Sequence, residues 1–81
     1  MDFDNTMKLN MIVRKWMQKH GISKSELKKM SGYDNVYDFL KGGVKHIPPE
    51  QAEKLLQLMP DDELREIASE FNWKEIPYYA S

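Results

Sequence analysis

Apolar residues in this 81-residue chain recur at intervals of three and four along almost its whole length. That interval is the period of an amphipathic α-helix, whereas no segment shows the period of two that a half-buried strand requires. The apolar positions form five short stripes: Leu9, Ile12, Val13, Trp16 and Met17; Leu27 and Met30; Val36, Phe39 and Leu40; Ala52, Leu55, Leu56 and Met59; Leu64, Ile67, Ala68 and Phe71. The pattern predicts an all-α fold, a compact single-domain bundle of about five short helices.

Residues that start or stop helices separate these stripes. Gly21 follows the first stripe, which His20 continues, at the position of a left-handed C-terminal cap. Ser23-Lys24-Ser25-Glu26 has the form of a capping box for the second helix, which we expect to end at Ser31-Gly32. The other boundaries are Asp34 as the cap of the third helix, Gly42-Gly43 at its end, Pro48-Pro49 in the first turn of the fourth helix, and Pro60 followed by Asp61-Asp62-Glu63 at the start of the fifth.

Length and composition exclude several classes of protein. A chain of 81 residues is one domain, and without cysteine it has no disulfide framework. Two lone histidines do not make a four-ligand metal site, so we expect no metal and no cofactor. No apolar run approaches the roughly 20 residues that cross a bilayer, and the first residues are acidic, unlike a signal peptide. These features predict a cytoplasmic protein that does not contact a membrane.

The net charge of −1 conceals a strong polarity along the chain. Residues 8–46 carry nine Lys and Arg against three Asp and Glu, a local charge of +6. Residues 47–81 carry three Lys and Arg against eight Asp and Glu, a local charge of −5. The basic half could place a positive face against a polyanion. The alternative is a solvated surface on which the charges happen to segregate.

Residues Met11 to Met59, roughly 60% of the chain, resemble the lambda-repressor-like (Xre-type) helix-turn-helix family. The family's elements read here, in order, as IVRKWMQKHG, ISKSELKKMSG, NVYDFLKGG and IPPEQAEKLLQLM. VYDFLKG is similar to the end of the family's recognition helix, with Val36, Phe39 and Leu40 as core anchors and Gly42 as its stop. We therefore expect a polar lead-in at residues 1–7, a helix-turn-helix domain at residues 8–72 and an aromatic C-terminal tail at residues 73–81.

One segment departs from the family pattern. Only Tyr33, Asp34 and Asn35 stand between Gly32 and Val36, so the turn and the start of the recognition helix are shorter by about two positions than in typical members. That start is the part that contacts base edges in such proteins. The residues left there include Asp34 and Asp38, whose carboxylates are repelled by phosphates unless one caps the helix and the other accepts from a cytosine amine.

The family geometry implies a set of phosphate contacts. Ser23, Lys24 and Ser25 would present the N-terminus of the second helix, where backbone N–H groups bind a phosphate. Lys28 lies on the same helix, and Lys41 and Lys45 lie at and beyond the end of the third. The alternative for each exposed lysine is a purely solvated side chain.

Two residues are candidates for contacts inside the groove. An amide such as that of Asn35 can pair with adenine. The alternative is that Asn35 supports the tight turn. Tyr37 could contact a base or a phosphate, or it could cover the core together with Tyr33. Trp16 belongs to the first apolar stripe and is expected in the core.

The leading hypothesis is therefore a small DNA-binding regulator of bacterial or phage type, with double-stranded DNA as its partner. It could dimerise through its last helix and the aromatic tail, or the tail could fold back onto the core. The alternative is a protein-interaction module on a helix-turn-helix scaffold, such as an antirepressor or an inhibitor. We do not expect an enzyme, because the chain has no pairing of nucleophile and base at motif spacing and a small bundle has little room for a pocket.

Overall fold

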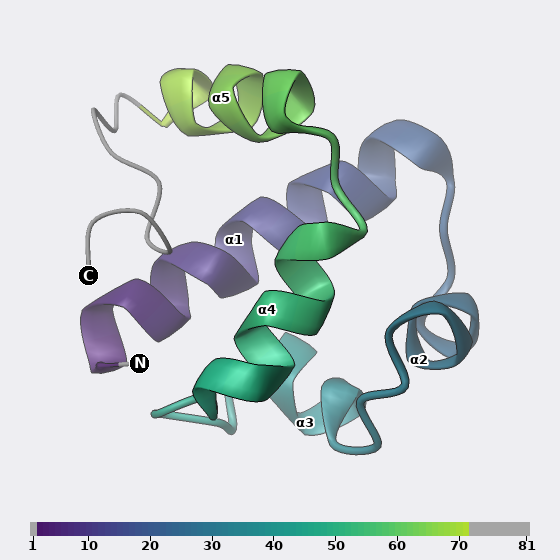
Figure 1. The fold of residues 1–81 in the computed structure, drawn as a ribbon, viewed down its shortest axis with the longest axis vertical. Helices are drawn as coiled ribbons and strands as arrows, with labels where there is room; N and C mark the ends of the chain where they lie inside the picture. The colour runs from purple at the N-terminus through teal and green to yellow at the C-terminus, as the bar shows by residue number, and fades with distance from the viewer. Residues whose placement is uncertain (1, 72–81) are drawn as a thin grey trace.

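The computed structural model describes residues 2–71. Within that range the chain forms five α-helices and no strand, so the predicted all-α fold is confirmed. The helices are Phe3–His20 (α1), Lys24–Ser31 (α2), Val36–Leu40 (α3), Pro49–Gln57 (α4) and Asp61–Glu70 (α5). The long helix α1 runs through the middle of the molecule, with α5 on one side of it and α3 on the other (Figure 1).

The five predicted stripes supply the core. The side chains with no exposed surface include Leu9 and Ile12 of α1, Leu27 of α2, Phe39 of α3 and Ile67 of α5, all at 0% exposure. Leu55 of α4 is 1% exposed, and Trp16 is 5% exposed, so its predicted place in the core is confirmed. Burial of these side chains against one another stabilises α2, α3, α4 and α5, which are too short to be stable alone.

The predicted ends of α1 and α2 are also confirmed. Gly21 and Gly32 adopt the left-handed conformation, with φ of +62° and +68°. Their N–H groups donate to the carbonyl oxygens of Met17 and Lys28, respectively. A residue with a β-carbon is strained in this conformation, which explains why glycine terminates both helices.

Helix α1 begins at Phe3, so it includes most of residues 1–7, which we expected to form a polar lead-in. Asp2 caps the helix by accepting a hydrogen bond of 2.8 Å from the Asn5 N–H group. Thr6 is fully buried, and its hydroxyl oxygen accepts a hydrogen bond of 3.1 Å from the Ile47 N–H group. A buried residue that is polar interrupts the apolar pattern, so periodicity alone missed the first turns of the helix.

Two further details differ from prediction. Met30 is 48% exposed, because Ser31 takes the inner position beside Leu27 and accepts a hydrogen bond of 3.2 Å from the Tyr33 N–H group. Asp34 does not cap α3: Asn35 holds the N-cap position and makes no side-chain capping bond. Instead the Val36 N–H group donates to the Tyr33 carbonyl oxygen at 3.2 Å, so a tight backbone turn takes the place of the cap.

Candidate nucleic-acid interface

The first turn of α2 is fixed by the predicted capping box. The Ser23 hydroxyl oxygen accepts a hydrogen bond of 3.1 Å from the Glu26 N–H group. The Glu26 carboxylate in turn accepts one of 3.0 Å from the Ser23 N–H group. These bonds with Ser23 hold the pKa of Glu26 below its ordinary value. The helix start therefore carries its own negative charge, and the N–H groups of Lys24 and Ser25 are the ones left for an external anion.

The turn from α2 to α3 consists of residues 32–35. Tyr33 is 5% exposed and packs on Phe39, with ring centroids 6.2 Å apart. Burial raises the pKa of the Tyr33 hydroxyl, and a hydrogen bond with the Asn35 side chain partly opposes that rise. Asn35 is the last residue of the turn, and its side chain is exposed to solvent.

Helix α3 is short and uses most of its residues for packing. Val36, Phe39 and Leu40 are buried, which leaves Tyr37 and Asp38 as its outward residues. At about 1.5 Å per residue, a helix of this size spans little more than one turn. Its outward surface is therefore narrow, and it carries one phenol and one carboxylate.

Lys28 and Tyr37 connect the exposed surfaces of α2 and α3. The Lys28 ammonium group lies 5.5 Å from the centroid of the Tyr37 ring, within the range of a cation–π interaction. Tyr37 is 40% exposed, so it does not cover the core as Tyr33 does. The contact places a positive charge beside an aromatic ring on the surface formed by α2 and α3.

Two residues at the end of α1 contact carboxylates of the acidic half. Lys19, at the end of α1, lies 3.3 Å from the Glu66 carboxylate and 3.5 Å from that of Glu70. Burial lowers the pKa of Lys19, but the bonds with these two carboxylates outweigh it and the net shift is upward. His20 lies 2.6 Å from the Glu63 carboxylate. Part of the acidic half thus neutralises the end of α1.

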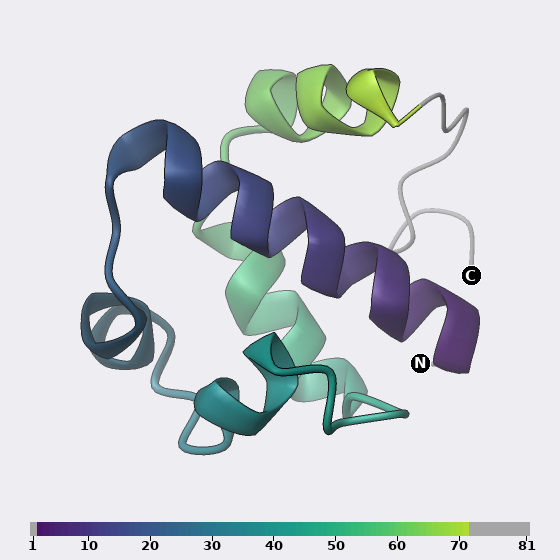
Figure 2. The same ribbon diagram turned by 180° about the vertical axis from the view of Figure 1, so that it is seen from behind.

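All eight predicted contact residues are exposed. Seven of them come from the segment between the N-cap of α2 and the C-cap of α3. We call their exposed surface the α2–α3 face: Ser23, Lys24, Ser25, Lys28, Asn35, Tyr37 and Lys41. None of its lysines forms a salt bridge within residues 2–71. Lys45 lies on the loop between α3 and α4, and this loop leaves the end of α3 on the side away from α2 (Figures 1 and 2).

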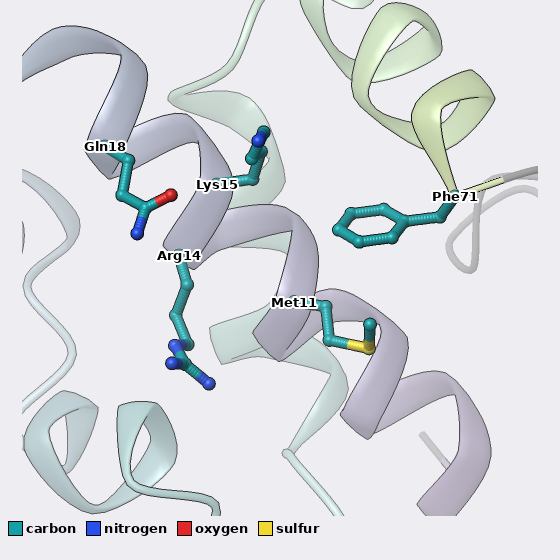
Figure 3. A pocket seen from close by; sticks show the side chains of 5 residues that line it. All are labelled: Met11, Arg14, Lys15, Gln18 and Phe71. Carbon is teal, nitrogen blue, oxygen red and sulfur yellow. The ribbon is translucent and has the colours of Figure 1, made fainter.

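Sequence reasoning missed Arg14 and Gln18, which are exposed on α1. Together with Met11, Lys15 and Phe71 they line a hollow of about 190 Å³ between α1 and the end of α5. Figure 3 shows the Phe71 ring reaching from α5 toward α1, near Lys15 and Met11. Arg14 belongs to the segment of charge +6, and it is four residues from Gln18, which puts both on one helix face. These two features were the available signal.

The last helix turns its apolar side inward. Leu64, Ile67 and Ala68 of α5 are buried, so a dimer contact through α5 would have to use its polar outer side. The aromatic tail, residues 73–81, lies outside the described residues. The predicted dimer therefore stays a prediction.

Comparison of the chain with protein-family models, curated proteins and solved structures finds no match. Within the described range, no helix combines the length and the apolar character needed to cross a membrane.

Proposed function

We propose that this protein binds double-stranded DNA through its α2–α3 face and acts as a small transcriptional regulator. The observation that carries the proposal is the arrangement of α2 and α3. A four-residue turn containing a left-handed glycine joins them, as in helix-turn-helix motifs. Lys24, Lys28 and Lys41 project from this unit without carboxylate partners among residues 2–71.

The proposed division of work follows from the chemistry of each group. The N–H groups at Lys24 and Ser25 bind one phosphate at the positive end of α2. Lys28 and Lys41 bind further phosphates on either side of α3. Asn35 and Tyr37 are the groups that can reach base edges or sugars, since they flank or lie on the outward side of α3.

The shape of α3 favours recognition that depends mainly on the DNA backbone. Only Tyr37 and Asp38 point outward from it, and the negative charge of the Asp38 carboxylate repels a phosphate. Affinity then comes mostly from the lysines, which replace counterions on the DNA. Such binding weakens steeply as salt is added.

The test is a titration of labelled random-sequence duplex with the protein at low and at physiological ionic strength. We expect binding at low salt that falls steeply at the higher salt, and we expect Lys28→Glu combined with Lys41→Glu to abolish it. Lys54→Glu is the matched control, because Lys54 is exposed on α4 and lies outside the α2–α3 face. Equal binding by the double variant and the control would show that this face is not the DNA site.

A second candidate function is a protein-binding module on the same scaffold. It is favoured by two exposed apolar side chains, Met30 of α2 at 48% exposure and Tyr37 of the α2–α3 face at 40%, which a protein partner would cover. Absence of duplex binding even at low salt would support this alternative over DNA binding.

A further inference from the structure

A second hollow, of about 380 Å³, lies between the last turns of α1 and the start of α2. Its apolar part is formed by Met17, Ile22 and Leu40, which come from α1, the α1–α2 connection and α3. Four side chains with polar ends complete the lining: Arg14, Gln18, Ser23 and Lys24. The volume is at the lower end of the range for ligand pockets, enough for one large side chain.

The charges around this hollow have one sign. Arg14 and Lys24 are both exposed, and among residues 2–71 no carboxylate lines the hollow. Glu26 is close in sequence, but its carboxylate is bound to the Ser23 N–H group and is not part of the lining. An apolar surface between Arg14 and Lys24 therefore favours a ligand with an apolar group in its centre and a negative charge on either side of it.

We propose that this hollow is the docking site for an acidic peptide segment of a partner protein. One apolar side chain of that segment packs on Met17, Ile22 and Leu40, while its carboxylates meet Arg14 and Lys24. The inference goes beyond DNA binding and does not depend on it.

Two other occupants fit the hollow less well. The DNA backbone offers phosphates but no large apolar side chain for the floor. Helix α5 of a second copy offers no apolar anchor, because its exposed residues are all polar: Asp61, Asp62, Arg65, Glu66, Ser69 and Glu70. The exposed segment Asp2-Phe3-Asp4 does place an apolar side chain between two carboxylates, so a dimer of the free protein that is lost in Phe3→Ala would identify a second copy as the occupant and overturn the proposal.

The position of the hollow has a consequence for DNA binding. Ser23 and Lys24 belong both to the hollow and to the α2–α3 face. A peptide bound in the hollow covers the start of α2, and its carboxylate pairs with Lys24. The partner and the duplex then compete for the same protein, whereas Arg14 serves the partner alone.

The experiment is a selection of binders to the folded protein from a displayed library of random linear peptides. We expect the recovered sequences to share one large apolar residue flanked by Asp or Glu. The strongest peptide, synthesised and labelled, is then titrated with each variant and followed by amide chemical shifts. The shift changes should centre on Met17, Ile22 and Leu40. Recovered peptides without acidic residues, or shift changes centred elsewhere, would overturn the proposal.

Variants separate this proposal from the DNA-binding one. Arg14→Glu should weaken the selected peptide roughly tenfold or more and Lys24→Glu should do the same, whereas Lys54→Glu should leave it unchanged. Circular dichroism verifies that each variant keeps its helices. Equal peptide affinity for Arg14→Glu, Lys24→Glu and Lys54→Glu contradicts the docking site, whatever the result with duplex. The double variant Lys28→Glu with Lys41→Glu tests only the DNA site, because neither residue lines the hollow.

Discussion

The side-chain amide of Asn10 joins the middle of α1 to the end of α3. Its nitrogen donates to the Phe39 carbonyl oxygen at 2.6 Å and lies 3.3 Å from that of Leu40. Asn10 is 5% exposed, so these bonds form away from water. The last carbonyl groups of a helix have no partner within it. Here a side chain from another helix donates to that of Leu40 and adds a donor to that of Phe39, which also accepts from the Gly42 N–H group at 3.1 Å. Asn10 thereby fixes where α3, and with it the outward side chain of Tyr37, lies relative to α1.

Replacing Asn10 with alanine should therefore destabilise the fold. Asn10→Ala leaves the Leu40 carbonyl oxygen without this donor and leaves the Phe39 carbonyl oxygen with backbone donors alone, at an expected cost of about 1 to 3 kcal/mol in the free energy of unfolding. Urea unfolding followed by circular dichroism measures this cost. Met11→Ala is the control on the same helix, because Met11 is 41% exposed. A loss no larger than that of the control would mean that the amide does not anchor α3.

The predicted core position of Leu40 leads to a second stability test. Leu40 is 6% exposed, whereas Tyr37, one turn earlier on α3, is 40% exposed. Leu40→Ala should lower the free energy of unfolding by roughly 2 to 5 kcal/mol, as buried truncations do. Tyr37→Ala removes a larger side chain from the surface and should cost less. The reverse order of the two urea midpoints would show that α3 packs through its other side.

Local signals in the sequence predicted much of this fold. The helical period identified five helices because each buries one side, and glycine fixed the ends of α1 and α2 because only it adopts the left-handed cap without strain. The capping box located the start of α2 because both of its bonds join residues only three apart.

Interactions between distant residues were beyond the reach of those signals. Thr6 and Asn10 are polar, and their burial is stabilised by Ile47 and Phe39, which lie 41 and 29 positions away. The same holds for the candidate site. Exposure of all eight contact residues could be predicted, but the separation of Lys45 from the α2–α3 face and the hollow beside Arg14 depend on how the helices pack.

Acid should weaken the attachment of α5 to α1 through Glu63. The hydrogen bond with His20, 2.6 Å away, is the main reason that the pKa of Glu63 lies below its ordinary value of 4.5, and a bond from the Trp16 indole contributes. A carboxyl group with a lowered pKa in the folded state stabilises the fold above its unfolded-state pKa and loses that effect as the pH falls through the folded value. Stability should therefore decrease below about pH 4.5.

Urea midpoints measured between about pH 6 and about pH 3 test this dependence. Glu63→Gln should lower the urea midpoint at about pH 6. It should also reduce the decrease of that midpoint as the pH falls toward about 3. Part of the fall should remain, because the pKa of Glu26 is also lowered. Glu50→Gln removes one charge from an exposed position on α4 and should keep the full slope. Identical slopes in all three proteins would exclude a role for Glu63.

Phosphate and base contacts on the α2–α3 face should differ in their response to salt and sequence. Lys28→Ala removes one proposed phosphate contact, so it should weaken binding to every duplex alike and reduce the salt slope by about one. Asn35→Ala removes a proposed base contact and leaves the charge unchanged, so its effect should appear only on a duplex selected for tight binding. Fluorescence anisotropy with random and selected duplexes over a range of salt concentrations measures both effects. A changed salt slope in Asn35→Ala, or a sequence-dependent loss in Lys28→Ala, would contradict these assignments, because an amide carries no charge and a lysine bound to phosphate reads no base.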